Sequence, residues 1–119
     1  MRCREPIHVE PKTWGREIWI VNNSLYCGKI LYIEKGKRCS LHFHRQKTES
    51  FYLRSGRLWV KTMPSPELTV VDAFELMPGQ CMDVPPGMVH QMEALEDAEL
   101  FEFSTQHFDS DSHRLAPGN

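Results

Sequence analysis

The sequence predicts an all-β fold, a sandwich or barrel of short antiparallel strands. Short apolar stretches are separated by turn-forming residues about every ten residues, the spacing expected of consecutive strands. Eight prolines and seven glycines punctuate these stretches. Helical periodicity is weak, and its one candidate, Glu93–Ala98, is too short to form a substantial helix. Many short strands between regular turns are typical of a sandwich or a barrel.

Each predicted strand is an apolar run that ends at a turn signal. Asn22–Ser24, Arg54–Gly56 and Met77–Gly79 carry the turn residues, and Met63–Pro66 interrupts pairing because proline has no N–H to donate. The predicted strands are Glu17–Val21, Tyr26–Ile33, Cys39–His44, Ser50–Leu53, Arg57–Lys61, Leu68–Asp72, Ala73–Leu76, Cys81–Val84, His90–Ala94 and Glu99–Ser104.

The 119 residues form a single predicted domain, 1–119, because no repeat, linker or low-complexity segment divides them. The polar segment 106–119 is expected to run over the surface and to end loosely. A net charge of −2 gives no support to nucleic-acid binding or to a polybasic membrane role. No apolar run approaches the ~20 residues of a membrane span, and residues 1–12 do not resemble a secretory signal. We therefore expect a cytoplasmic protein.

The four cysteines form no CxxC pair, which argues against a zinc ribbon or a thioredoxin-like site. In a reducing compartment they are expected to be free thiols without an intramolecular disulfide. Cys39 is out of register with His42 on the same predicted strand, so its sulfur should point away from any metal bound there.

Histidines carry the strongest functional signal. His42 and His44 lie two apart on a predicted strand, so both rings point to one face. Glu49 opens the next strand, and a hairpin would return it beside them, while His90 follows the tight turn at Pro85–Gly87. Three imidazoles and one carboxylate suit a divalent transition metal: Fe(II), Mn, Ni, Co or Zn. Four such ligands on an octahedral ion leave two adjacent positions open.

The spacing of these residues forms two motifs that resemble those of the cupin superfamily. The motifs, 36–56 and 79–94, read Gly36-x5-His42-x-His44-x4-Glu49-x6-Gly56 and Gly79-x5-Pro85-x-Gly87-x2-His90. Ala94 stands where the family pattern often has Asn, which is not a metal ligand. The resemblance implies a double-stranded β-helix, or jelly-roll barrel, with a metal inside it held by His42, His44, Glu49 and His90. It also implies a homodimer in which the two chains exchange the segment Trp14–Val21.

Strand parity extends the predicted pocket from the metal ligands to their neighbours. Lys29 is the notable candidate, since a lysine among apolar residues costs free energy if it is buried without a partner. It is either a rim residue that reaches water or a pocket cation that binds an anion or acts as a base. Parity also places Arg38, Ser40, Phe51, Leu53, Met92 and Ala94 inward, with Asp83 and Glu102 at the pocket edge.

A narrower resemblance is to the cupin domain of type II mannose-6-phosphate isomerases. Matching positions are Trp14, Gly15, Lys29, Gly36, Arg38, Ser40, Leu41, His44 and Glu49. The chain departs from that family at Thr13, where Pro is usual, and at His42, where Gln is frequent.

This resemblance implies a metal-dependent aldose–ketose isomerase acting on a sugar or sugar phosphate. Lys29 and Arg38 are its candidate catalytic residues. Their possible roles are to carry the proton or to bind a phosphate group of the substrate. Two alternatives stay open: an Fe(II)-dependent dioxygenase of a small molecule, and a cupin that binds a sugar or metabolite without converting it.

Overall fold

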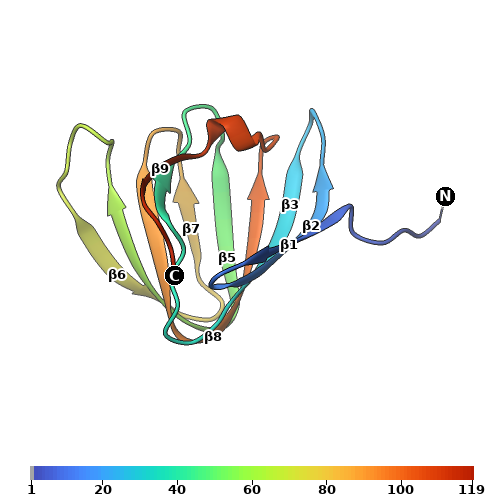
Figure 1. Cartoon of the computed structure of the whole chain (residues 1–119), viewed down its shortest axis with the longest axis horizontal. Helices are drawn as coiled ribbons and strands as arrows, with labels where there is room; N and C mark the ends of the chain where they lie inside the picture. Colours follow the sequence, from blue (N-terminus) through green and yellow to red (C-terminus); the bar gives the residue numbers. More distant parts are fainter. Residues whose placement is uncertain (1) are drawn as a thin grey trace.

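The computed structural model describes residues 2–119, and its strands form one curled antiparallel sheet. In Figure 1 the sheet runs from β1 and β2 (blue) on one side to β6 on the other. The elements are β1 (His8–Lys12), β2 (Gly15–Asn22), β3 (Cys27–Ile33), β4 (Leu41–Phe43), β5 (Glu49–Met63), β6 (Asp72–Leu76), β7 (Cys81–Val84), β8 (Val89–Ser104), the short 3-10 helix η1 (Asp109–Asp111) and β9 (His113–Ala116). This architecture confirms the predicted all-β jelly roll. Within the described residues, no helix is long and apolar enough to cross a membrane.

Strand order brings distant motifs together. The order is β1-β2-β3-β8-β4-β9, and β5 pairs with β6, β7 and β8. The long strand β8 is therefore the link between the N-terminal strands, the first histidine strand β4 and the central strand β5.

Four predicted strands are halves of two long ones. Ser50–Leu53 and Arg57–Lys61 both lie in β5, and His90–Ala94 and Glu99–Ser104 both lie in β8. The predicted turn at Arg54–Gly56 is a stretch of register shifts that bends β5 without ending it. Gly56 has a φ of +86°, and a Cβ there would collide with the backbone of Asp97, so only glycine fits this bend.

Several sequence predictions are wrong. Leu68–Asp72 is not a strand, since 64–71 is irregular and β6 begins at Asp72. The predicted strand Cys39–His44 shortens to β4, and only an isolated bridge from Arg38 to Glu93 precedes it. Strands β1 and β9 were not predicted. Pro11 argues against a strand at β1, and the polar composition of 113–116 gives no strand signal at β9. Segment 106–119 does not end loosely: β9 pairs with β4, and the Asn119 N–H bonds to the carbonyl of Arg38.

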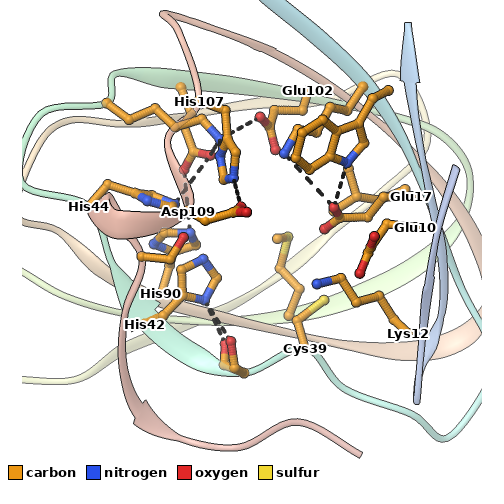
Figure 2. Close-up of a pocket in the computed structure, with 18 of the residues that line it drawn as sticks. Glu10, Lys12, Glu17, Cys39, His42, His44, His90, Glu102, His107 and Asp109 are labelled. Carbon is orange, nitrogen blue, oxygen red and sulfur yellow. Dashed lines mark hydrogen bonds and ion pairs between the residues drawn. The ribbon is translucent and has the colours of Figure 1, made fainter. Parts of the chain in front are cut away.

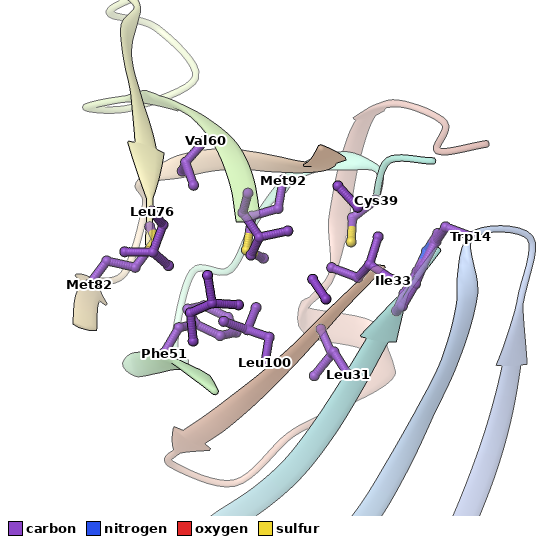
Figure 3. Packing of buried hydrophobic residues seen from close by; sticks show 14 of the residues in the cluster. Trp14, Leu31, Ile33, Cys39, Phe51, Val60, Leu76, Met82, Met92 and Leu100 are labelled. Atoms are coloured by element: carbon purple, nitrogen blue, oxygen red, sulfur yellow. The ribbon is translucent and has the colours of Figure 1, made fainter. Parts of the chain in front are cut away.

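The hydrophobic core packs between the strands of the curled sheet, as Figure 3 shows. Leu53, Leu58 and Val60 of β5 and Leu100 of β8 are fully buried, and Trp14 covers the edge of the cluster. Alternate residues of β3 (Cys27, Lys29, Leu31 and Ile33) are buried, while those between them are half-buried. This pattern places Lys29 on the inner face.

Candidate metal centre

Three histidines from two adjacent strands form a cluster inside the barrel. His42 of β4 pairs directly with His90 of β8, and His44 lies on the same face, just beyond the end of β4. The ligating nitrogens of the three rings lie within 4.8 Å of one another. Figure 2 shows the three rings together on one side of the pocket. The predicted grouping of these histidines is confirmed.

The Nδ1 atom of each ring is engaged by the backbone. Because a carbonyl oxygen can only accept, each Nδ1 carries the hydrogen and leaves Nε2 with a free lone pair. Backbone partners of this kind orient metal-binding imidazoles. The acceptors are Ser40 for His42 (2.9 Å), Asp111 for His44 (3.0 Å) and Met88 for His90 (3.1 Å).

Glu49 lies against two of these rings at the start of β5. Its Oε1 is 3.6 Å from His44 Nε2, and its Oε2 is 3.4 Å from His90 Nε2. The side chain is 2% exposed. Both Glu49 Oε2 and His90 Nε2 are buried without a hydrogen-bond partner, an arrangement that costs free energy unless something else satisfies them. A cation bound between these two acceptors would satisfy both, so the donor set fits a metal.

The electrostatics of the cluster also fit a metal. Burial lowers the pKa of His42 to about 3 and those of His44 and His90 to about 4, so all three are neutral near pH 7. Neutral imidazole is the form that binds a metal. Burial, followed by the neighbouring Glu102 carboxylate, raises the pKa of Glu49 to about 8. A bound divalent cation would stabilise the ionised carboxylate and would therefore lower the pKa of Glu49 again.

Lys47 is a buried cation beside the cluster that was not predicted. Its side chain is 2% exposed, and its Nζ lies 3.1 Å from Glu49 and 2.7 Å from Glu102. It also donates to Nδ1 of His107 at 3.0 Å, since the ring's Nε2–H is directed at Asp109. A signal was present in the sequence: Lys47 and Glu49 are two residues apart, the spacing that places side chains on one face of an extended chain.

Asp111 fixes the loop that carries Lys47. Its carboxylate accepts the backbone N–H groups of Arg45, Gln46 and Lys47 at 2.8 to 3.2 Å, while its carbonyl accepts from His44. Burial acts to raise the pKa of Asp111, but the three N–H donors outweigh it and hold the pKa below its usual value. The C-terminal segment thus holds His44 and the loop that carries Lys47 in place.

Lys29 lies inside the same cavity and is 3% exposed, so it is a pocket residue and not a rim residue. Its Nζ lies 3.9 Å from the centre of the Trp19 ring and 3.9 Å from Oε1 of Glu17. Lys29 is also in register with Glu102 on β8. Burial lowers its pKa, against the opposing effect of Glu102.

Four residues of the predicted pocket do not line the cavity. Leu53 and Ala94 point inward as predicted but are buried in the hydrophobic core, whereas Arg38 and Asp83 are exposed. Arg38 is exposed and does not line the cavity, because the chain leaves regular strand geometry between it and β4 and parity no longer holds. For the same reason Cys39 lines the cavity instead of pointing away, although it is not part of the metal-ligating cluster found among the described residues. Asp83 is exposed on β7 and accepts a hydrogen bond from Ser50 at 2.6 Å. Glu102 is buried in the cavity. All four cysteines are free.

The cavity measures about 510 Å³ and has two walls of different chemistry. The histidine cluster forms one, and charged side chains of β1 to β3 form the other, as Figure 2 shows for Glu10, Lys12 and Glu17. The residues on this second wall that sequence reasoning missed are His8, Glu10, Lys12, Glu17 and Trp19; His107 and Asp109 are further lining residues that it missed. Strand β1 was not predicted, so no parity argument reached its members.

Similarity to known proteins agrees with this geometry. One relative is the D-lyxose ketol-isomerase of Thermofilum sp. (strain ex4484_79), 31% identical over an alignment that covers 82% of this chain and 66% of the relative. Among solved structures, the capsular polysaccharide assembling protein CapF of Staphylococcus aureus superposes with a TM-score of 0.83 at 16% identity over 97% of this chain. Oxalate decarboxylase of Bacillus subtilis superposes with a TM-score of 0.80 at 19% identity over 91% of it.

These matches differ in what they cover. The chain spans 33% of the CapF chain, 30% of the decarboxylase chain and just under two thirds of the isomerase. The two structures, at such low identity, show the fold. The sequence model of the cupin family matches residues 19–116, which include both histidine motifs and the strands that bring them together. The chain is therefore a member of the cupin family.

Proposed function

We propose that this cupin is a metal-dependent sugar isomerase that interconverts an aldose and its ketose. The observation that carries the proposal is a single cavity that holds both the His42–His44–His90 cluster with Glu49 and the buried amine of Lys29. The 31% identity to a D-lyxose ketol-isomerase supports the same reaction class.

His42, His44, Glu49 and His90 are the residues that would hold a divalent metal, of which Mn, Fe, Co, Ni and Zn all suit the donors. When bound, such an ion supplies Lewis acidity to two neighbouring sugar oxygens. The protein contributes neutral imidazoles already oriented by carbonyl acceptors, so little rearrangement is needed.

Lys29 is the proposed proton carrier. Aldose–ketose exchange moves one proton between adjacent carbons, with a matching proton transfer between their oxygens. An amine whose pKa is lowered by burial can accept a proton nearer neutral pH than an exposed lysine can. The Trp19 ring and Glu17 hold Nζ in the cavity and stabilise it when it is protonated.

Charge pairing within the cavity favours a sugar without phosphate. The two buried ammonium groups already have carboxyl partners: Lys47 contacts Glu102 and Glu49, and Lys29 contacts Glu17. Arg38, the other candidate for binding a phosphate group, is exposed and lies outside the cavity. A phosphate dianion would have to break these pairs, whereas hydroxyl groups can both donate to the carboxylates and accept from the amines.

The test is conversion of sugars by metal-loaded protein in deuterated water, followed by NMR. The panel contains D-lyxose, other aldopentoses and aldohexoses, and their phosphates, each with Mn, Co, Ni, Zn or Fe(II). Ketose formation from a free sugar supports the proposal. Absence of conversion with every metal overturns it. Oxygen consumption would then indicate a dioxygenase, and tight sugar binding alone would indicate a binding protein.

A homodimer remains part of the proposal. Trp14–Val21, the expected exchange arm, lies largely in β2, which pairs with β1 and β3 of its own chain, so exchange is not needed to complete the sheet. The outer face of the sheet offers a second surface. An apolar row crosses five strands in register on that face: Val9, Ile18, Ile30, Phe101 and Tyr52. We also propose a cytoplasmic location, which free thiols favour.

A further inference from the structure

Lys47 is held in one orientation by three buried partners. Its Nζ lies 2.7 Å from Glu102 Oε2, 3.0 Å from His107 Nδ1 and 3.1 Å from Glu49 Oε1. An ammonium group has three hydrogens, and each has an acceptor here. Because Lys47 is 2% exposed, water does not compete for these contacts.

The two oxygens of Glu49 are in different environments. Oε1 is paired with the ammonium of Lys47. Oε2 has no hydrogen-bond partner and lies 3.4 Å from the similarly unpartnered Nε2 of His90. One oxygen is therefore engaged by the protein, and the other is free to bind a cation.

We infer that Lys47 is a positioning residue that makes Glu49 a ligand through Oε2 alone. The inference rests on the metal centre of the proposed function and adds a reason for the buried lysine. Three imidazoles and one carboxylate oxygen occupy four positions of a six-coordinate ion and leave two for neighbouring oxygens of a ligand. If Oε1 were released, Glu49 could bind through both oxygens, as carboxylates do in many metal sites, and take one of those positions.

A simpler role for Lys47 would be to offset the charge of two buried carboxylates. The chain allows the two roles to be separated. Lys47→Met/Glu102→Gln removes one charge of each sign, so the charge balance is kept while Oε1 of Glu49 loses its partner. Lys47→Met alone is the second variant, and Lys47→Arg is the matched control because a guanidinium can still donate to Oε1.

The experiment uses the full chain loaded with Co²⁺ and two small probes followed by visible absorption. Acetohydroxamate binds through two oxygens and needs two open positions, whereas azide needs one. Circular dichroism verifies that each variant is folded. In Lys47→Met/Glu102→Gln and in Lys47→Met, acetohydroxamate should bind roughly tenfold or more weakly than in the wild type, the loss expected for one charge-assisted contact. Azide should bind with little change, and Lys47→Arg should bind both probes like the wild type.

The outcomes separate this inference from the proposed function. Acetohydroxamate affinity that is unchanged in both Met variants overturns the role of Lys47 and leaves the metal centre in place. Equal weakening of azide and acetohydroxamate also overturns it, because that result indicates general disruption of the site. A wild-type chain that binds no Co²⁺ overturns the metal centre itself, and the inference with it.

Discussion

The ammonium of Lys29 lies 3.9 Å from the centre of the Trp19 ring, inside the cavity that holds the histidine cluster. A cation packed on an indole ring is stabilised by the ring's electrons and kept from reaching solvent. Trp19 is itself fixed, because its Nε1–H donates to Glu17 at 2.9 Å. Lys29 is therefore held inside the cavity.

Replacing Lys29 with Met should abolish proton transfer while leaving the metal in place. We expect kcat to fall by about 10²–10⁴-fold, the usual contribution of a general acid–base residue, with unchanged metal content. Metal analysis and turnover of the substrate found in the sugar panel provide the measurement. Lys61→Met, which changes an exposed lysine of β5, is the matched control. Wild-type turnover in Lys29→Met would remove Lys29 from the mechanism.

Removing one ring of the cluster should remove most of the metal. His90→Ala removes a candidate ligand that is 1% exposed. Glu49 Oε2 then lacks the neighbouring Nε2, whose lone pair would bind the same ion. A bound ion stabilises the folded state by about 2.7 kcal/mol at a concentration 100-fold above Kd, so the wild-type rise in Tm on adding metal should disappear in the variant. His8→Ala, at an exposed histidine of β1, should keep the full rise. Equal rises in both variants would contradict the assignment.

The grouping of the three histidines was predictable because the information about it is local. The period of two in a strand places His42 and His44 on one face, and His90 follows the tight turn that Pro85–Gly87 marks. The same rule gave the inner face of β5 correctly, including Phe51. For β3 it grouped Lys29 with Leu31 and Ile33 on one face but left open which face is the inner one.

The rest of the site depends on contacts that no local pattern records. Parity failed at Arg38 because the chain is irregular before β4. Asp111 and His107 reach the site from a polar segment with no hydrophobic periodicity. The free-energy cost of burying the Lys47 charge is offset by an ion pair with Glu102, which is more than 50 residues away in the chain. The residues next to Lys47 in the sequence therefore do not indicate its environment.

The carboxylate of Asp111 should contribute measurably to stability. Asp111→Asn removes the charge that three backbone N–H groups share, and we expect a loss of about 1–3 kcal/mol in the free energy of unfolding. The native pKa of Asp111 is lowered, so its contribution is present above the ordinary value of 3.8 and is lost as the pH falls through the lower native value. Urea denaturation of the metal-free protein measures both effects, with the exposed Asp72→Asn as the control. Equal stability of the two variants at pH 7 would argue against this role.

The apolar row on the outer face should make the protein a dimer. Ile30 lies in register with Ile18 on one side and Phe101 on the other, and its side chain points away from the cavity. Ile30→Glu places a charge in the middle of the row and should give monomers of 13.9 kDa, where the wild type gives twice that mass. Light scattering after size exclusion provides the measurement. A monomeric wild type at high concentration would contradict the homodimer.

Metal binding at pH 7 should release about one proton per ion, and Glu49 is the source. The three histidines are already neutral at this pH, with pKa values of about 3 and 4, so they have no proton to lose. Glu49, with a pKa of about 8, is largely protonated without metal and must ionise to bind it. Calorimetry in two buffers of different ionisation enthalpy counts the protons. The number should fall toward zero at pH 9, and Glu49→Gln should release none.

The same pKa shift predicts how the stability of the metal-free protein depends on pH. Between about pH 7.5 and 9 the histidines are largely neutral in both states, because their ordinary pKa is 6.5 and their folded pKa values are lower. Glu49, in contrast, holds a proton in the folded state until the pH passes its pKa of about 8, and it is ionised in the unfolded state. The folded state then binds more protons, so its stability falls as the pH rises through this window. Bound metal fixes Glu49 as the anion and should remove the slope. A metal-free Tm that is constant from about pH 7.5 to 9, together with no proton release at pH 7, would mean that Glu49 is ionised before metal binds.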